Sequence, residues 1–215
     1  NTEYDTTNGR VTHTKGGNVY AGGMGRYYML DGVTPITSIE WWKVGNVKST
    51  NLTISGENTW IMGNVYGGGE LGAVTPYTDN TNAQSPVVQG GTTTISITGG
   101  TIGTEVTGAT PEKTTVTTAG VVQYTYGSVY GGGMGMEGHD DQDRHGGEVG
   151  GNTAVSMSGE NTEVRASVYG GGEMAVVDGN TTVTINNGKI GRNEVKPADD
   201  VDAGYVLFGG ATMGN

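Results

Sequence analysis

A short phrase that returns along the chain constrains its fold more than any other feature. Val followed by Tyr and a run of small residues, mostly glycine, occurs at Val19, Val65, Val129 and Val168, with a degenerate copy at Val206. The valines are 46, 64, 39 and 38 residues apart, which indicates a unit of 38 or 39 residues with insertions in the earlier copies. One such unit cannot bury its apolar side alone, so successive units must stack.

A second phrase lies between the copies of the first and alternates apolar residues with Thr, Ser or Asn. Alternation at period two is typical of a strand with one buried face. We expect three pairs of side chains to point inward and the intervening Thr and Ser to face water. The pairs are Ile95 with Ile97, Val155 with Met157, and Val183 with Ile185.

The two phrases together predict an all-β chain, because helical spacing of apolar residues is missing and glycine interrupts nearly every longer window. We predict a right-handed parallel β-helix, or β-solenoid, of about four to five coils with inserted loops. It forms a single domain over 1–215, with a lead-in at 1–16 and repeats over 17–215, and belongs to a longer repetitive protein. A four-bladed propeller and a β-sandwich are the alternatives.

Side chains of the repeated phrase should alternate between the two faces of a strand. The valines would then stack inside, and an external ladder would form from Tyr20, Tyr66, Tyr130 and Tyr169, followed by Leu207. Such a ladder is a candidate site for sugar rings, or it only stabilises the stack. The glycine run after each tyrosine either makes a sharp corner with unusual backbone angles, which we favour, or leaves room for a neighbouring segment.

Two further groups of residues are candidates for contact with a ligand. Trp41 and Trp42 are adjacent, so in a strand one of them would be exposed and available to a ligand or partner. Asp141, Asp143 and His145 lie at the first, third and fifth places of a calcium-loop pattern, although its twelfth place holds Asn152 instead of Glu. The alternative is a solvated loop without Ca²⁺, and no other cofactor is expected.

Composition limits the function classes. Lys and Arg number 11 against 22 Asp and Glu, which gives a net charge of −11 and disfavours nucleic-acid binding. No apolar run is long enough for a membrane span. A polysaccharide lyase or hydrolase would need carboxylates from several coils, whereas Asp140, Asp141, Asp143 and Arg144 belong to one local loop. We therefore expect a protein that is not an enzyme.

With its Val-Tyr-Gly-Gly-Gly units and Thr-rich strands, the chain resembles the Gly- and Thr-rich repetitive surface proteins of gut Bacteroidetes and similar bacteria. These are similar to autotransporter passengers and large β-helical adhesins. The resemblance covers 17–215 and implies an extracellular or cell-surface role in attachment or as a structural stalk. The implied partners are glycans or proteins on host or bacterial surfaces, and the family brings no catalytic residues.

Three hypotheses follow. The first is a non-enzymatic structural or adhesive segment that could also associate end to end with its copies. The second is a carbohydrate-binding or polysaccharide-degrading β-helix. The third is binding to ice or to a crystal surface through threonines such as Thr53, Thr94 and Thr184, which we rank last because the threonine columns look irregular.

Overall fold

The computed structural model describes residues 2–5, 10–13, 17–25, 43–79, 87–103, 127–136, 145–191 and 207–208. These residues form an all-β structure, and no α-helix occurs among them. Most of the strands belong to four repeated units, each with three strands.

The units differ little in the strands that they contribute. Unit 1 has β3 (Val19–Tyr20), β4 (Thr50–Ile54) and β5 (Trp60–Ile61). Unit 2 has β6 (Val65–Tyr66), β9 (Thr93–Ile97) and β10 (Thr101–Ile102). Unit 3 has β11 (Val129–Tyr130), β12 (Thr153–Met157) and β13 (Glu163–Val164). Unit 4 has β14 (Val168–Tyr169), β15 (Thr181–Ile185) and β16 (Lys189–Ile190), and β17 (Leu207–Phe208) follows it.

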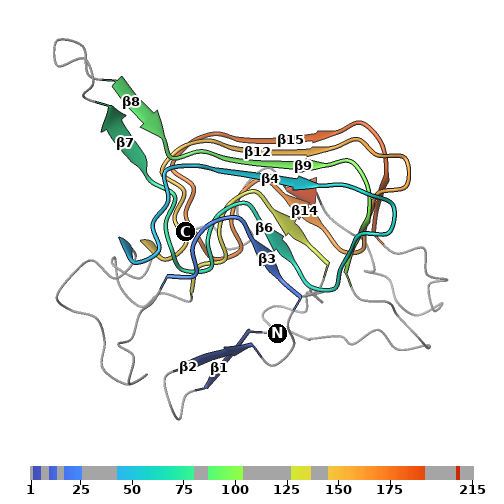
Figure 1. The fold of residues 1–215 in the computed structure, drawn as a ribbon, viewed down its shortest axis with the longest axis horizontal. Helices are drawn as coiled ribbons and strands as arrows, with labels where there is room; N and C mark the ends of the chain where they lie inside the picture. The colour runs from blue at the N-terminus through green and yellow to red at the C-terminus, as the bar shows by residue number, and fades with distance from the viewer. Residues whose placement is uncertain are drawn as a thin grey trace.

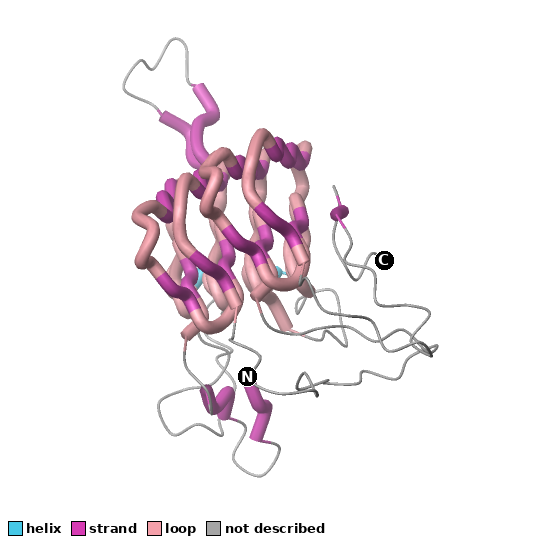
Figure 2. The backbone as a smooth tube through the Cα atoms, turned by 90° about the vertical axis from the view of Figure 1, so that its right-hand side faces the viewer, coloured by secondary structure: helices cyan, strands magenta, loops and turns pink. Residues whose placement is uncertain are grey.

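Equivalent strands of successive units pair in parallel, so each sheet takes one strand from every unit. The three sheets have the orders β3-β6-β11-β14-β17, β4-β9-β12-β15 and β5-β10-β13-β16. The long strands β4, β9, β12 and β15 lie side by side in Figure 1, and the quarter turn in Figure 2 shows the units as a row of rungs. A fourth ladder, which the sequence did not predict, consists of single parallel bridges that link Val47, Val74, Val149 and Val177.

The inward side chains of the three sheets form one apolar core. Val65, Val129 and Val168 are fully buried, as the repeat predicts, and Ile95 pairs in register with Val155. The expected inward pairs of β9 and β12 are confirmed. In β15 the expectation holds only in part, because Val183 is half-buried and Ile185 is 36% exposed at the edge of the stack.

The glycine runs serve close backbone approach, not the corner that we favoured. None of the glycines at 67–69, 131–133 and 170–172 has a φ in the left-handed region. A Cβ on Gly68 would instead lie 2.7 Å from the backbone nitrogen of Gly133. The run pairs with its neighbours through bonds such as Gly68 N–H to the Gly132 carbonyl at 2.9 Å. Glycine is required there because a side chain would push adjacent units apart.

The last copy of the phrase pairs one residue later than expected. Val168 pairs with Leu207 and Tyr169 with Phe208, so Val206 does not continue the valine ladder. Leu207 therefore occupies the valine position and Phe208 the tyrosine position. The reason is visible in the sequence, where Leu207-Phe208 directly precedes Gly209-Gly210 just as Val-Tyr precedes the earlier glycine runs.

Two antiparallel hairpins accompany the parallel sheets and were not predicted. β1 (Thr2–Asp5) pairs with β2 (Arg10–His13) inside the expected lead-in. β7 (Pro76–Asp79) pairs with β8 (Val87–Gly90) as an insertion between the valine bridge and the long strand of unit 2. Figures 1 and 2 show this second hairpin projecting from the stack.

Long insertions occur at two connections within the units, after the glycine run and after the third strand. In units 1 and 3 a long segment separates the glycine run from the valine bridge, over 26–42 and 137–144, whereas units 2 and 4 make this connection directly. In units 2 and 4 a long segment follows the third strand, over 104–126 and 192–206, whereas units 1 and 3 pass to the next unit within a few residues. These two kinds of insertion therefore recur every second unit, whereas the β7–β8 hairpin occurs in unit 2 without a counterpart in unit 4.

Candidate functional site

The tyrosine column (Tyr20, Tyr66, Tyr130 and Tyr169) is the first candidate, and it is not external. Tyr66, Tyr130 and Tyr169 are 1%, 5% and 9% exposed, so the expectation of an outward ladder is wrong. Successive ring centroids are 4.8, 5.0 and 4.8 Å apart with interplanar angles of 9°, 6° and 10°. The rings point away from the valine core and form their own cluster with Met134. Both faces of Tyr66 and Tyr130 lie against other rings, which leaves no free face for a sugar.

Asparagines that precede the valines hold the first two tyrosines in place. The Asn18 and Asn64 amides donate to the hydroxyls of Tyr20 and Tyr66, each at 3.2 Å. Their carbonyl oxygens accept from the backbone N–H of the next unit, Asn18 from Asn64 at 2.8 Å and Asn64 from Ser128 at 2.9 Å. One asparagine therefore positions a tyrosine and fastens two units together.

The tyrosine hydroxyls also reach across two units. Tyr20 Oη donates to the Met134 sulfur at 3.2 Å, and Tyr66 Oη donates to Glu173 Oε2 at 2.5 Å. Burial raises the pKa of the Glu173 carboxyl above its ordinary value. Burial, and then the nearby charge of Glu173, raises the pKa of Tyr66 as well. These contacts connect unit 1 with unit 3 and unit 2 with unit 4, so each of them spans two units.

A ladder of buried threonines links the start of each long strand to the glycine run of the next unit. It was not predicted from the sequence. The hydroxyls of Thr50, Thr93 and Thr153 each donate to the carbonyl of the first glycine in the next unit's run, at 2.5 Å. All three side chains are buried. Their signal was present in the sequence, because each lies two residues before an inward apolar residue and so belongs to the inward face.

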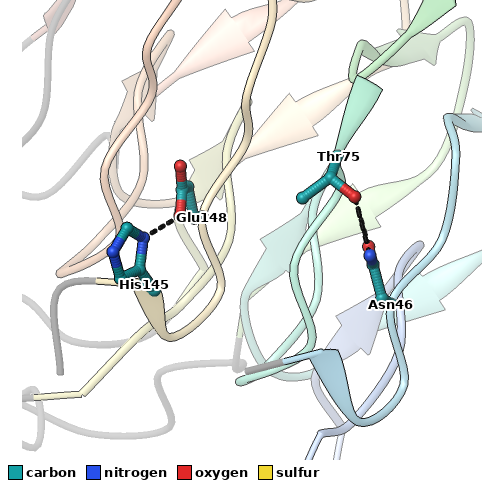
Figure 3. Close-up of polar contacts among 4 residues, drawn as sticks. All are labelled: Asn46, Thr75, His145 and Glu148. Carbon is teal, nitrogen blue, oxygen red and sulfur yellow. Dashed lines mark hydrogen bonds and ion pairs between the residues drawn. The ribbon is translucent and has the colours of Figure 1, made fainter. Parts of the chain in front are cut away.

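The acidic loop is described only from His145 onward, and Asp141 and Asp143 lie outside the described residues. His145 Nδ1 contacts the Glu148 carboxylate at the end of the loop, as Figure 3 shows. Burial raises the pKa of Glu148. Within the described ranges no three metal-ligating side chains come together, so the proposed calcium site stays a prediction.

A second polar contact, at the corresponding turn of unit 1, joins that unit to unit 2. Asn46 Nδ2 donates to Thr75 Oγ1 at 2.6 Å in the right half of Figure 3. Asn46 and Glu148 both follow a turn whose last glycine has positive φ, 78° at Gly45 and 69° at Gly147, and both precede a bridging valine. The two contacts differ, because Asn46 joins its turn to Thr75 of unit 2, whereas His145 and Glu148 both belong to the turn of unit 3.

Of the three tryptophans, the structure describes Trp60, which lies at the surface. Trp41 and Trp42 lie outside the described residues, so their exposure stays a prediction. Trp60, which was not singled out as a site, is 47% exposed on the first strand of its sheet. Its indole N–H donates to the Gly103 carbonyl at 2.7 Å, and the Arg165 guanidinium lies 5.6 Å from the ring centroid.

The outward face of β4, β9, β12 and β15 is the second candidate, and we call it the hydroxyl face. Its side chains stand in columns, because the four strands pair without a register shift. One column consists of Asn51, Thr94, Ala154 and Thr182. The next consists of Thr53, Ser96, Ser156 and Thr184. All eight are exposed or half-buried.

Two flanking columns extend the hydroxyl face at the ends of the strands. Ser49, Thr92, Asn152 and Asn180 precede the strands, and Ser55, Thr98, Ser158 and Asn186 follow them. Backbone bonds such as Thr50 N–H to the Thr92 carbonyl and Thr98 N–H to the Ile54 carbonyl continue the register there. Of the sixteen residues, fifteen are Ser, Thr or Asn, one is Ala, and none is charged or aromatic. The threonine columns are therefore more regular than the sequence suggested.

Comparisons with protein-family models, with curated proteins and with solved structures find no match to this chain. Within the described part of the chain, no helix has the length and apolar character needed to cross a bilayer. The function must therefore be argued from the stack and its surfaces.

Proposed function

We propose that the chain is a non-enzymatic structural and adhesive segment of an extracellular or cell-surface bacterial protein. In this proposal the four units are successive coils of a right-handed parallel β-solenoid, and β17 opens a fifth. The parallel ladders, with one strand from every unit in each of three sheets, support a continuous rod. The resemblance to repetitive surface proteins supports the location, with glycans or proteins of other surfaces as partners.

One observation carries the proposal: among the described residues, the stack is open at both ends. β4 and β5 are edge strands at one end, and β15 and β16 are edge strands at the other. The large apolar side chains that are exposed also belong to the outer units: Met24, Trp60 and Met62 to unit 1 at 58%, 47% and 52%, and Ile185 to unit 4 at 36%. Open edges with apolar neighbours favour the addition of further strands.

The side of the stack favours a structural role over catalysis. Hydrolysis of a polysaccharide commonly uses two carboxyl groups that flank the scissile bond. On the long strands the matched outward positions of successive units carry hydroxyl and amide groups instead. A polysaccharide-binding role is the second candidate, and the uncharged hydroxyl face is the observation that favours it.

Light scattering coupled to size-exclusion chromatography tests the proposed end-to-end association. We expect the apparent mass of the isolated 215-residue chain to rise above 22.1 kDa with concentration at physiological salt. Ile185→Lys places a charge at the open end and should return the mass to that of the monomer. Thr94→Lys makes the same charge change on the side of the stack and should leave association unchanged. A wild-type mass that stays at the monomer value at every concentration contradicts the proposal.

A further inference from the structure

We propose that the hydroxyl face binds a neutral polysaccharide that lies flat against β4, β9, β12 and β15. This inference rests on the proposed adhesive function and adds to it a site and a ligand class. It replaces the tyrosine column, whose rings are stacked on one another, as the place of sugar contact.

Charge selects the class of ligand. A charged partner is held by groups of opposite charge, and none of the sixteen residues of the hydroxyl face can supply one. Of the charged groups near its borders, Lys48 Nζ lies 4.0 Å from the Tyr77 ring centroid and Glu57 accepts from Asn161 at 3.4 Å, whereas Glu160 and Asp178 are exposed and acidic. An uncharged ligand is therefore favoured, in a protein whose net charge of −11 would repel anionic chains.

The shape of the face selects an extended ligand. Neighbouring strands lie about 4.8 Å apart, and outward side chains along one strand repeat every ~6.7 Å. The hydroxyls therefore form a flat grid instead of converging on one point. Each Ser or Thr hydroxyl both donates and accepts, as sugar hydroxyls do, so a chain of sugars can find partners along the grid without a fixed orientation.

The size of the face argues for a repeating partner over a folded protein. Four strands and four columns span roughly 14 Å by about 20 Å, whereas a stable protein interface buries about 800 Å² on each side. A polysaccharide compensates for weak single contacts by presenting many equal sites, and a longer stack of units would add further rows. A neutral polysaccharide therefore fits the face better than a second copy of the chain does.

Sedimentation with insoluble polysaccharides tests the site. The full chain is mixed with microcrystalline cellulose, with chitin and with mannan, and the bound fraction is measured between 50 and 500 mM NaCl. We expect retention by at least one of the three, with little change across the salt range because no ion pairs form. Thr94→Lys/Ser156→Lys should lower the apparent affinity at least tenfold. Gln89→Lys/Thr101→Lys, which adds the same charge on the projecting hairpin and on the outward side of β10, should bind like the wild type.

A milder variant guards against misfolding. Thr94→Ala/Ser96→Ala/Ser156→Ala removes three hydroxyls without bulk and should also weaken retention, with an unchanged circular dichroism spectrum. Three results overturn the inference: no retention by any neutral polysaccharide, equal loss in the Gln89→Lys/Thr101→Lys control, or thermal hysteresis of ice growth without retention. The light-scattering test is independent of the hydroxyl face, so a failure here with intact association leaves the structural role standing.

Discussion

At the residue scale, glycine and threonine hold adjacent units together alongside the apolar core of valine and isoleucine. A Cβ on Gly132 would lie 2.8 Å from the backbone nitrogen of Gly172, so the run keeps adjacent units at strand spacing. Thr93 satisfies the Gly131 carbonyl of the next unit at 2.5 Å. In these runs glycine therefore allows close packing of backbone against backbone, whereas other glycines, such as Gly45 and Gly147, have a positive φ.

Glu173 gives a prediction on pH dependence. Because burial raises the pKa of its carboxyl above 4.5, the folded chain holds the proton more tightly than the unfolded chain. The stability that this group contributes is complete below about pH 4.5 and is lost as the pH rises through the folded pKa. Glu173→Gln removes the charge and can still accept from Tyr66. We expect its free energy of unfolding to exceed that of the wild type at pH 7, with the difference vanishing at pH 4.

Chemical denaturation of both proteins between pH 4 and 8 measures this effect. Glu160→Gln, at an exposed turn, is the matched control and should show no comparable gain. Glu148 changes stability in the same direction, since burial raises its pKa too, but it is common to both proteins and cancels in the comparison. A Glu173→Gln variant that is less stable than the wild type at pH 7 would contradict the assignment of a destabilised buried carboxylate.

At the element scale, each long strand has an inward face and an outward face, and neighbouring residues alternate between the two faces. Thr93 points inward and is buried, whereas Thr94 points outward and is exposed. Thr93→Val keeps the shape but leaves the buried Gly131 carbonyl without this donor, which we expect to cost about 1–2 kcal/mol. Thr94→Val should change the free energy of unfolding by less than about 0.5 kcal/mol. Urea denaturation measures both, and equal effects at the two positions would refute the assigned register.

The sequence predicted the strands well where apolar side chains alternate, and less well elsewhere. The pairing of Val19, Val65, Val129 and Val168 follows directly from the repeat. The shift to Leu207 was missed because the valine, not the following glycine pair, was used to align the last copy. The hairpin β7–β8 was missed because an insertion that pairs with itself leaves no trace in the repeat.

The burial of the tyrosine column could not be predicted from alternation alone. The alternation of side chains correctly predicts that Tyr66 points away from the valine core. It gives no information on whether other residues cover the tyrosines on that side. The contact of Tyr66 with Glu173 joins residues two units apart, and the spacing of single units gives no indication of it. The hydroxyl face, in contrast, was present in the sequence as Thr and Ser at alternate positions, and only its register was unknown.

At the scale of the whole molecule, the described units stack through parallel ladders that repeat from unit to unit. Stability in such a stack is a sum over neighbouring units, and the end units lack one neighbour. This explains why the exposed large apolar residues that the structure describes belong to units 1 and 4. In the proposed function, adhesion takes place along the side of the stack and self-association at its ends, so the two properties can be changed separately.

Disulfide formation between paired cysteines tests the stack most directly, because the chain has no native cysteine. Ser96 and Ser156 pair in register although 60 residues separate them, so Ser96→Cys/Ser156→Cys should close an intramolecular disulfide on mild oxidation. Thr53→Cys/Thr184→Cys uses the same column three units apart, roughly 14 Å, and should stay reduced. Mass spectrometry of the folded monomer distinguishes the two pairs. A closed distant pair, or a near pair that remains reduced, would contradict the in-register stack.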